Sequence, residues 1–273
     1  MESGQGDQAG LESRTVTYQY ITVAREDRLT IVTINRPEAY NALNAEAHRE
    51  LADVFDTFAT DPDQWVSIVT GAGDKAFCAG HDLKQQASGG GMVVPPTGFA
   101  GLTGRFDMTK PVIAAVNGVA MGGGFETALA CDIIVASTRA VFALPEPRVG
   151  LAALAGGLQR LPRVVGLKHA MGMMLTGRRV SAEEGVRLGF VNEVVEGDVL
   201  AAARRWAEQI LACSPMAIRA TKDAVLRGLD APVESALKAG WEYPAMKAML
   251  ASEDAIEGPA AFAEKRAPVW QGR

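Results

Sequence analysis

The sequence predicts an α/β fold in which β-β-α units repeat and a layer of helices follows. Apolar, β-branched runs alternate with helical patterns in the first two-thirds of the 273 residues, and helical patterns dominate the last third. Hydrophobic residues make up 48% of the chain, which is enough for a core. We expect a disordered polar tail over residues 1–13, a core over 14–210 and a helical region over 211–273.

The first elements are a hairpin and a helix. Residues 15–24 and 28–37 are alternating, β-branched runs, and a short polar link joins them, which predicts two paired strands. Asn44 is a typical N-cap residue, so a helix is expected after it. Apolar residues at helical spacing then predict one buried face: Leu51, Val54, Phe55 and Phe58.

Strands and a glycine-rich helix follow. WVSIVTG (65–71) predicts a short strand, and KPVIAAVNG (110–118) predicts a strand that is buried on both faces. Between them, residues 85–98 form a loop too long for a simple connection. A helix is expected after the glycines at 122–124, and DIIVAS (132–137) predicts another strand.

From about Leu158 onward the pattern is mostly helical. Ser181 begins a Ser-x-x-Glu capping box. Pro215, after Ser214, suits a first helical position, and Ser252 is expected to cap the last helix.

Composition excludes several classes of protein. The net charge of −5 and the pI of about 5.4 disfavour nucleic acid as a partner, because phosphate backbones recruit basic stripes. The three cysteines form no CxxC pair, and the three histidines form no ligand pattern, so neither a disulfide framework nor a metal site is expected. No run approaches roughly 18 apolar residues, and the N-terminus resembles no signal peptide. We therefore expect a cytoplasmic protein without a membrane segment.

Two tempting motifs are rejected. GAGDKA (71–76) matches a dinucleotide-binding fingerprint, but no helix pattern follows it and no acidic residue lies about 20 positions on. Cys78 has no histidine placed to activate it as a nucleophile. His48 falls in the first predicted helix, where we expect it to be solvated.

Three consecutive glycines, Gly122–Gly124, open a predicted helix, although glycine is about 1 kcal/mol worse than alanine inside a helix. One interpretation is tight packing of helix on strand. The other is close approach of a ligand to the unpaired N–H groups of the helix N-terminus. Glu126 favours the second interpretation, because it lies about one turn beyond Gly123 and faces the same side.

A second glutamate, Glu146, stands between Pro145 and Pro147. We expect this segment to be stiff and not helical. A glutamate held in this way is unusual for a merely solvated charge. Two carboxylates and a backbone oxyanion site are the groups needed for proton transfer beside a carbonyl.

Five motifs follow one another along the chain: FCAGHDLK (77–84), KPVIAAVNGVAMGGGFETALACDI (110–133), FALPEPRVGL (142–151), GGLQRLPRVVG (156–166) and LTGRRVSAEEGVRLGFVNEVV (175–195). In this order they resemble the enoyl-CoA hydratase, or crotonase, family. The likeness runs from about residue 15 to the C-terminus. Within the family, GFAGLTGRFD, GGGFETALA, FALPE and the C-terminal tail are similar to the carnitinyl-CoA dehydratase branch.

The resemblance implies a spiral of β-β-α units and a set of roles. The backbone N–H groups of His81 and Gly123 would form the oxyanion hole. Glu126 would be the general base that activates water for attack at Cβ, and Glu146 would supply the proton at Cα. No metal or redox cofactor is implied. The implied contacts to coenzyme A or substrate are Ala79, His81, Asp82, Leu83, Lys84, Gly122 and Lys265.

Alternatives stay open within the same resemblance. An isomerase can work with one carboxylate, so both glutamates favour a hydratase, and a non-catalytic acyl-CoA binder would need neither. The family implies a homotrimer or a dimer of trimers. Residues 151–155 (LAALA) offer neither charge nor ring to a trimethylammonium group, although Trp241 and Tyr243 could supply a face. We therefore expect uncharged enoyl-CoA substrates to be preferred over crotonobetainyl-CoA.

Overall fold

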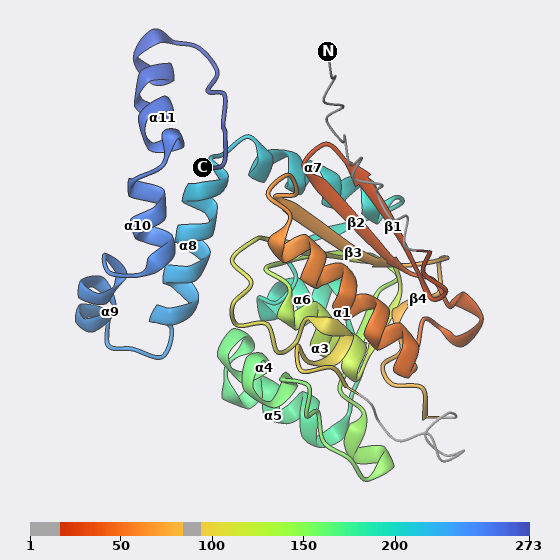
Figure 1. Ribbon diagram of the computed structural model, residues 1–273. Coiled ribbons are helices and arrows are strands. Elements are labelled where there is room, and N and C mark those ends of the chain that lie inside the picture. The colour runs from red at the N-terminus through yellow and green to blue at the C-terminus, as the bar shows by residue number, and fades with distance from the viewer. Residues whose placement is uncertain (1–16, 84–93) are drawn as a thin grey trace, which may run out of the picture.

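Two sheets form the centre of the computed structural model, which describes residues 17–83 and 94–273 (Figure 1). The larger sheet has the order β1-β2-β3-β5-β7-β10, and the smaller has the order β4-β6-β8-β9. The larger sheet contains β1 (Ile21–Glu26), β2 (Leu29–Ile34), β3 (Val66–Gly71), β5 (Val112–Val116), β7 (Ile133–Ser137) and β10 (Glu193–Val195). The smaller contains β4 (Ala76–Cys78), β6 (Val119–Met121), β8 (Val141–Ala143) and β9 (Val180–Ser181).

From β3 to β8 successive strands go to alternate sheets, which produces the predicted β-β-α repeat. β3, β5 and β7 pair in parallel in the larger sheet, while the strand that follows each of them joins the smaller sheet. Helix α3 (Gly123–Ala130) follows β6 and leads back to the larger sheet at β7, and helices α4 (Gly157–Val165) and α5 (Leu167–Thr176) follow β8. The hairpin of β1 and β2 is antiparallel, as the sequence predicts.

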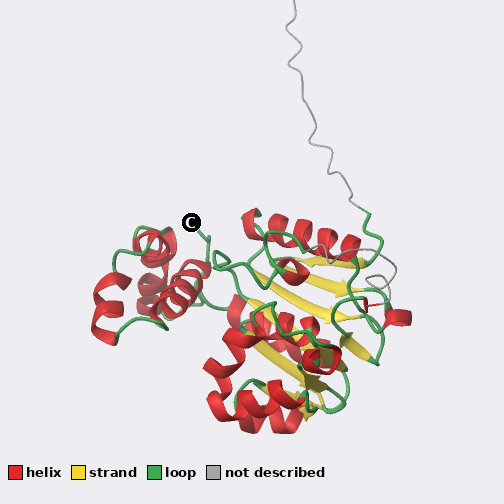
Figure 2. Cartoon of the chain, turned by 90° about the horizontal axis from the view of Figure 1, so that it is seen from below, coloured by secondary structure: helices red, strands yellow, loops and turns green. Residues whose placement is uncertain are grey.

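Helices cover the sheets on both sides (Figure 2). α7 packs on β3, β5 and β7, and its residues Ala202, Ala203 and Ala207 lie in the apolar cluster beneath it. The helices of the core are α1 (Ala45–Thr60), α3 (Gly123–Ala130), α4 (Gly157–Val165), α5 (Leu167–Thr176), α6 (Ala182–Leu188) and α7 (Val199–Leu211). The later helices, which stand to one side of the sheets in Figure 1, are α8 (Pro215–Gly228), α9 (Val233–Gly240), α10 (Pro244–Leu250) and α11 (Glu253–Glu264).

The predicted caps are confirmed. Asn44 Oδ1 accepts a hydrogen bond from Ala47 N at 2.8 Å, and the predicted buried face of α1 is inaccessible to solvent. Three serine side chains accept from the N–H three residues on, which satisfies an otherwise unpaired donor at each helix start: Ser181 at α6, Ser214 at α8 and Ser252 at α11.

Two sequence-based expectations need correction. His48 is fully buried rather than solvated, because the turn Phe99–Gly101 (η2) packs on its face of α1. The sequence predicts a non-helical segment at Glu146, but Glu146–Val149 (η3) forms one 3₁₀ turn, which tolerates Pro147 near its start. The stretch after Leu158 is mostly helical, as the sequence predicts; it also contains β9 and β10, which are too short to show a periodic pattern.

The rejected fingerprint at 71–76 links β3 to β4 and starts no helix, so its rejection is confirmed. Across the two described ranges, no helix has the length and apolar character to cross a membrane. The expected tail at 1–13 lies outside the described residues.

Candidate active site

At each of the three glycines before and within α3, a side chain would collide with a different neighbour. Gly122 has φ 54° and ψ −127°, a conformation that strains any L side chain, and a Cβ there would lie 2.9 Å from Glu146 Oε1. A Cβ on Gly123 would overlap the ring of Phe99, and one on Gly124 would overlap the Cys78 carbonyl. The packing interpretation therefore holds for Gly124, while Gly122 faces a catalytic candidate.

The loop after β4 reaches the start of α3. Gly80 has φ 93°, and a Cβ there would lie 3.3 Å from the backbone nitrogen of Gly123. His81 follows directly, and both His81 and Gly123 line the same cavity. Among residues 17–83 and 94–273, the structure shows no hydrogen bond donated by the backbone N–H of His81 or Gly123. The N–H of Gly123 lies at a helix N-terminus, where partial positive charge favours an anion.

Glu126 is a buried carboxylate on the first turn of α3. The residue is 3% exposed, and its Oε1 accepts a hydrogen bond from Gly157 N at 2.8 Å. The pKa of Glu126 is raised to about 7, chiefly by burial and to a smaller extent by the nearby charge of Glu146, against the lowering effect of the Gly157 N–H. Its proton is therefore mobile at neutral pH.

Glu146 comes from the 3₁₀ turn after β8 and is half-buried. Oε1 lies beside Gly122, and Oε2 has no hydrogen-bond partner among the described residues. Burial also raises the pKa of Glu146. Two carboxyl groups with raised pKa values thus line the same cavity as Gly122 and Gly123, an arrangement suited to proton transfer in both directions.

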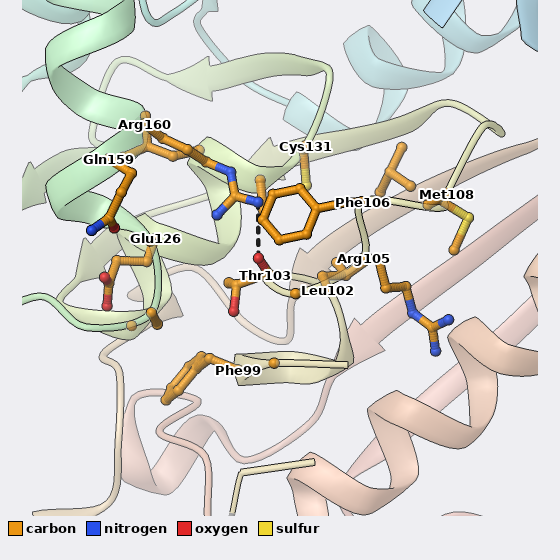
Figure 3. Close-up of a pocket in the computed structure, with 18 of the residues that line it drawn as sticks. Phe99, Leu102, Thr103, Arg105, Phe106, Met108, Glu126, Cys131, Gln159 and Arg160 are labelled. Atoms are coloured by element: carbon orange, nitrogen blue, oxygen red, sulfur yellow. Dashed lines mark hydrogen bonds between the residues drawn. The ribbon is translucent and has the colours of Figure 1, made fainter. Parts of the chain in front are cut away.

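A cavity of about 1700 Å³ opens beside this pair. Figure 3 shows Arg160 between Glu126 and Phe106, with its guanidinium 5.5 Å from the centre of the Phe106 ring. Arg160 also donates to the Thr103 carbonyl at 2.8 Å (Figure 3). Phe106 is 80% exposed although aromatic, because its ring faces the cavity.

The sequence profile described as enoyl-CoA hydratase/isomerase matches residues 24–273. The chain belongs to this family. It is 46% identical over 259 residues to carnitinyl-CoA dehydratase of Escherichia coli (strain K12), an alignment that covers 92% of this chain and 98% of that protein.

Solved structures of the family share the fold. An enoyl-CoA hydratase from Mycobacterium tuberculosis H37Rv superimposes with a TM-score of 0.88 at 43% identity, covering 93% of this chain and 99% of that one. An enoyl-CoA hydratase from Bacillus anthracis gives 0.85 at 35% identity, covering 93% and 100%. The predicted crotonase-like fold is thereby confirmed.

Most of the residues that the family resemblance predicts for coenzyme A or substrate do gather at the cavity. The cavity-lining members are Ala79, His81, Leu83 and Gly122. Asp82 instead forms an ion pair with Arg36 at 3.1 Å. Lys265 is exposed at the end of α11 and is absent from the described lining of the cavity. Lys84 lies outside the described residues.

Several residues of this family site were missed by sequence reasoning. Gly157 holds Glu126 through its N–H, and its sequence signal was the glycine pair before α4. Phe99 and Arg160 line the cavity without any pattern that distinguishes them. Neither Trp241 nor Tyr243 is among the described residues that line it.

Cys78 is also as inert as expected. It is buried beneath α3, and burial raises the pKa of its thiol to about 12, so it carries no thiolate at neutral pH. Within the described part of the chain, no group of three or more His, Cys, Asp or Glu side chains is arranged to hold a metal ion.

Proposed function

We propose that the protein is an enoyl-CoA hydratase, a hydro-lyase that adds water reversibly across the 2,3 double bond of an enoyl-CoA thioester. One observation carries this proposal: the carboxyl groups of Glu126 and Glu146 line the same cavity as His81 and Gly123, whose backbone N–H groups donate no hydrogen bond among the described residues. Membership of the enoyl-CoA hydratase/isomerase family supports the same reaction class.

The N–H groups of His81 and Gly123 receive the thioester oxygen. Attack of water at Cβ moves electrons toward that oxygen, and the enolate-like charge is stabilised by donors already in place. One such donor is typically worth about 3 kcal/mol of transition-state stabilisation. Because α3 contributes its positive end here, the site favours the charge that develops during the reaction.

The two glutamates divide the proton transfers. Glu146 lies beside Gly122, next to the oxyanion site, so it is the group near Cα and donates its proton there. Glu126 lies one turn further along α3 and accepts the proton that water loses as its oxygen bonds to Cβ. In dehydration the two roles reverse. These steps use protein groups and water, and we propose that no metal or redox cofactor takes part.

The acyl group is proposed to be uncharged. Leu151 and Leu154 of the loop before α4 line the cavity, as does Phe106. The Arg160 guanidinium lies 5.5 Å from the centre of the Phe106 ring, where it repels a second cation. These three residues also offer no carboxylate to a trimethylammonium group. The second candidate function, crotonobetainyl-CoA hydration, is favoured by the 46% identity to carnitinyl-CoA dehydratase.

We further propose a homotrimer or a dimer of trimers in the cytoplasm, with acyl-CoA as the small-molecule partner and neither nucleic acid nor membrane. Exposed Lys265, which is not among the described residues that line the cavity, would reach the coenzyme A phosphates of a neighbouring subunit. The three unpaired cysteines suit a reducing compartment.

The test is a panel of CoA thioesters followed by enoyl absorbance. Crotonyl-CoA should be hydrated, and kcat/KM for it should exceed that for crotonobetainyl-CoA. Glu126→Gln and Glu146→Gln should each lower turnover at least ~100-fold with little change in acyl-CoA affinity, while the exposed Glu208→Gln should match wild type.

Three outcomes would contradict parts of this scheme. Conversion of a 3-enoyl-CoA without hydration would show an isomerase. Binding without turnover of any thioester would show a binder. A tenfold preference for crotonobetainyl-CoA would assign the carnitine-type substrate instead.

A further inference from the structure

A buried histidine outside the proposed catalytic machinery supports one wall of the site. His48, on α1, has no solvent-exposed surface. Its Nδ1 accepts a hydrogen bond from the backbone N–H of Ala100 at 3.1 Å, across 52 positions of sequence. Since a protonated imidazole has no free lone pair, this hydrogen bond requires the neutral form. Burial lowers the pKa of His48 to about 4, with a smaller effect from His81, so the imidazole is neutral at physiological pH.

The turn that His48 holds is conformationally costly. Ala100 has φ 53° and ψ 20°, in the left-handed region that non-glycine residues rarely occupy. Gly101 also has a positive φ of 64°, and a Cβ there would lie 2.5 Å from Ala52 Cα on α1. The turn Phe99–Gly101 is thus pressed onto α1, and the acceptor on His48 satisfies its buried N–H group.

The same turn carries Phe99 to the oxyanion glycine. The His48 and Phe99 rings meet edge to face, with centroids 4.4 Å apart. On its other side the Phe99 ring fills the space where a side chain of Gly123 would stand. The His48 ring also lies nearly parallel to that of His81, at 6.1 Å. His48 therefore contacts a residue at each of the two proposed oxyanion donors, while it does not line the cavity itself.

We propose that His48 is a positioning residue that fixes the oxyanion site through the Phe99 turn. His48 accepts the hydrogen bond from the Ala100 N–H and so holds the turn in place. The Phe99 ring of this turn packs against Gly123. This inference rests on the proposed hydratase function, because it concerns the same site. We therefore expect loss of the His48 acceptor to weaken polarisation of the thioester carbonyl and to leave the affinity for coenzyme A nearly unchanged.

Two substitutions of His48 separate the effect of losing the hydrogen-bond acceptor from the effect of changing the side-chain volume. His48→Leu keeps similar bulk but leaves the Ala100 N–H unpaired, whereas His48→Asn presents an oxygen near the position of Nδ1. We expect His48→Leu to lower kcat at least tenfold with the dissociation constant for a bound acyl-CoA changed less than threefold. His48→Asn should recover most of the lost kcat.

A spectroscopic measurement reports on the oxyanion site directly. The carbonyl stretching frequency of a bound enoyl-CoA falls when N–H donors polarise it. His48→Leu should lose at least half of the wild-type shift, and His48→Asn should keep most of it. A merely structural role for His48 would lower the melting temperature without changing the carbonyl frequency of the folded, ligand-bound fraction.

Phe99→Leu tests whether His48 acts on Gly123 through the Phe99 ring. It also keeps the proposal testable if His48→Leu does not fold. It should lower kcat and the carbonyl shift without weakening binding. The double variant His48→Leu/Phe99→Leu should be no worse than the poorer single variant, because both act on one element. Independent, multiplicative losses would overturn the inference, as would a wild-type carbonyl shift in either single variant. If wild type hydrates no enoyl-CoA, the proposed function fails first, and that result is distinct from these.

Discussion

Glu126→Gln should make the protein more stable at alkaline pH while it removes activity. The pKa of Glu126 rises from 4.5 to about 7, chiefly because the side chain is buried. At about 1.4 kcal/mol per pKa unit, ionising this group in the folded state costs roughly 3 kcal/mol. Glutamine has nearly the same shape, and its side-chain oxygen can keep the hydrogen bond from Gly157 N.

The sign of the pH effect follows from the direction of the shift. Between pH 4.5 and about 7 the folded protein binds a proton at Glu126 that the unfolded chain has lost. The stabilising contribution is therefore fully present below pH 4.5 and is lost as pH rises through 7. The variant does not titrate at this position. Its free energy of unfolding relative to wild type should rise by roughly 3 kcal/mol between pH 4.5 and pH 8.

The assay is chemical denaturation of both proteins at a fixed concentration across this pH range. Taking the difference between pH values removes any constant cost of burying the amide. Glu208→Gln, on the exposed face of α7, is the control and should show no such trend. A relative stability that is flat from pH 4.5 to pH 8, or that falls, would refute the assignment of Glu126 as a buried, destabilised carboxylate.

Three further outcomes are expected. In wild type, kcat/KM for hydration should rise with pH through about 7 as Glu126 becomes able to accept a proton, and a pH-rate profile without this limb would contradict its role as base. Gly124→Ala should lower the free energy of unfolding by about 2 kcal/mol or more, because its Cβ meets the Cys78 carbonyl, whereas Gly172→Ala on α5, with open space around it, should stabilise by up to about 1 kcal/mol. Asn44→Ala should cost about 1 kcal/mol in the same denaturation assay through loss of the α1 N-cap, and an unchanged midpoint would show the cap to be dispensable.

Local sequence patterns determined the elements whose signals lie within a few residues. The β1–β2 hairpin, the N-cap at Asn44 and the buried face of α1 follow from alternation, helical spacing and capping chemistry. The ordered motifs also identified the family. Glu126 and Glu146 could be selected because a glutamate after glycines, or between prolines, is locally unusual.

Only the tertiary structure decided which distant groups meet. Gly157 supplies the N–H that holds Glu126 from 31 positions away, and His48 supports the turn at Ala100 from 52 positions away. Periodicity marks His48 as part of a helix, but burial depends on which segment packs over that face. The short strands β4 and β9 exist for the same reason, since two or three residues carry no period and pair only where a neighbouring strand is already in place.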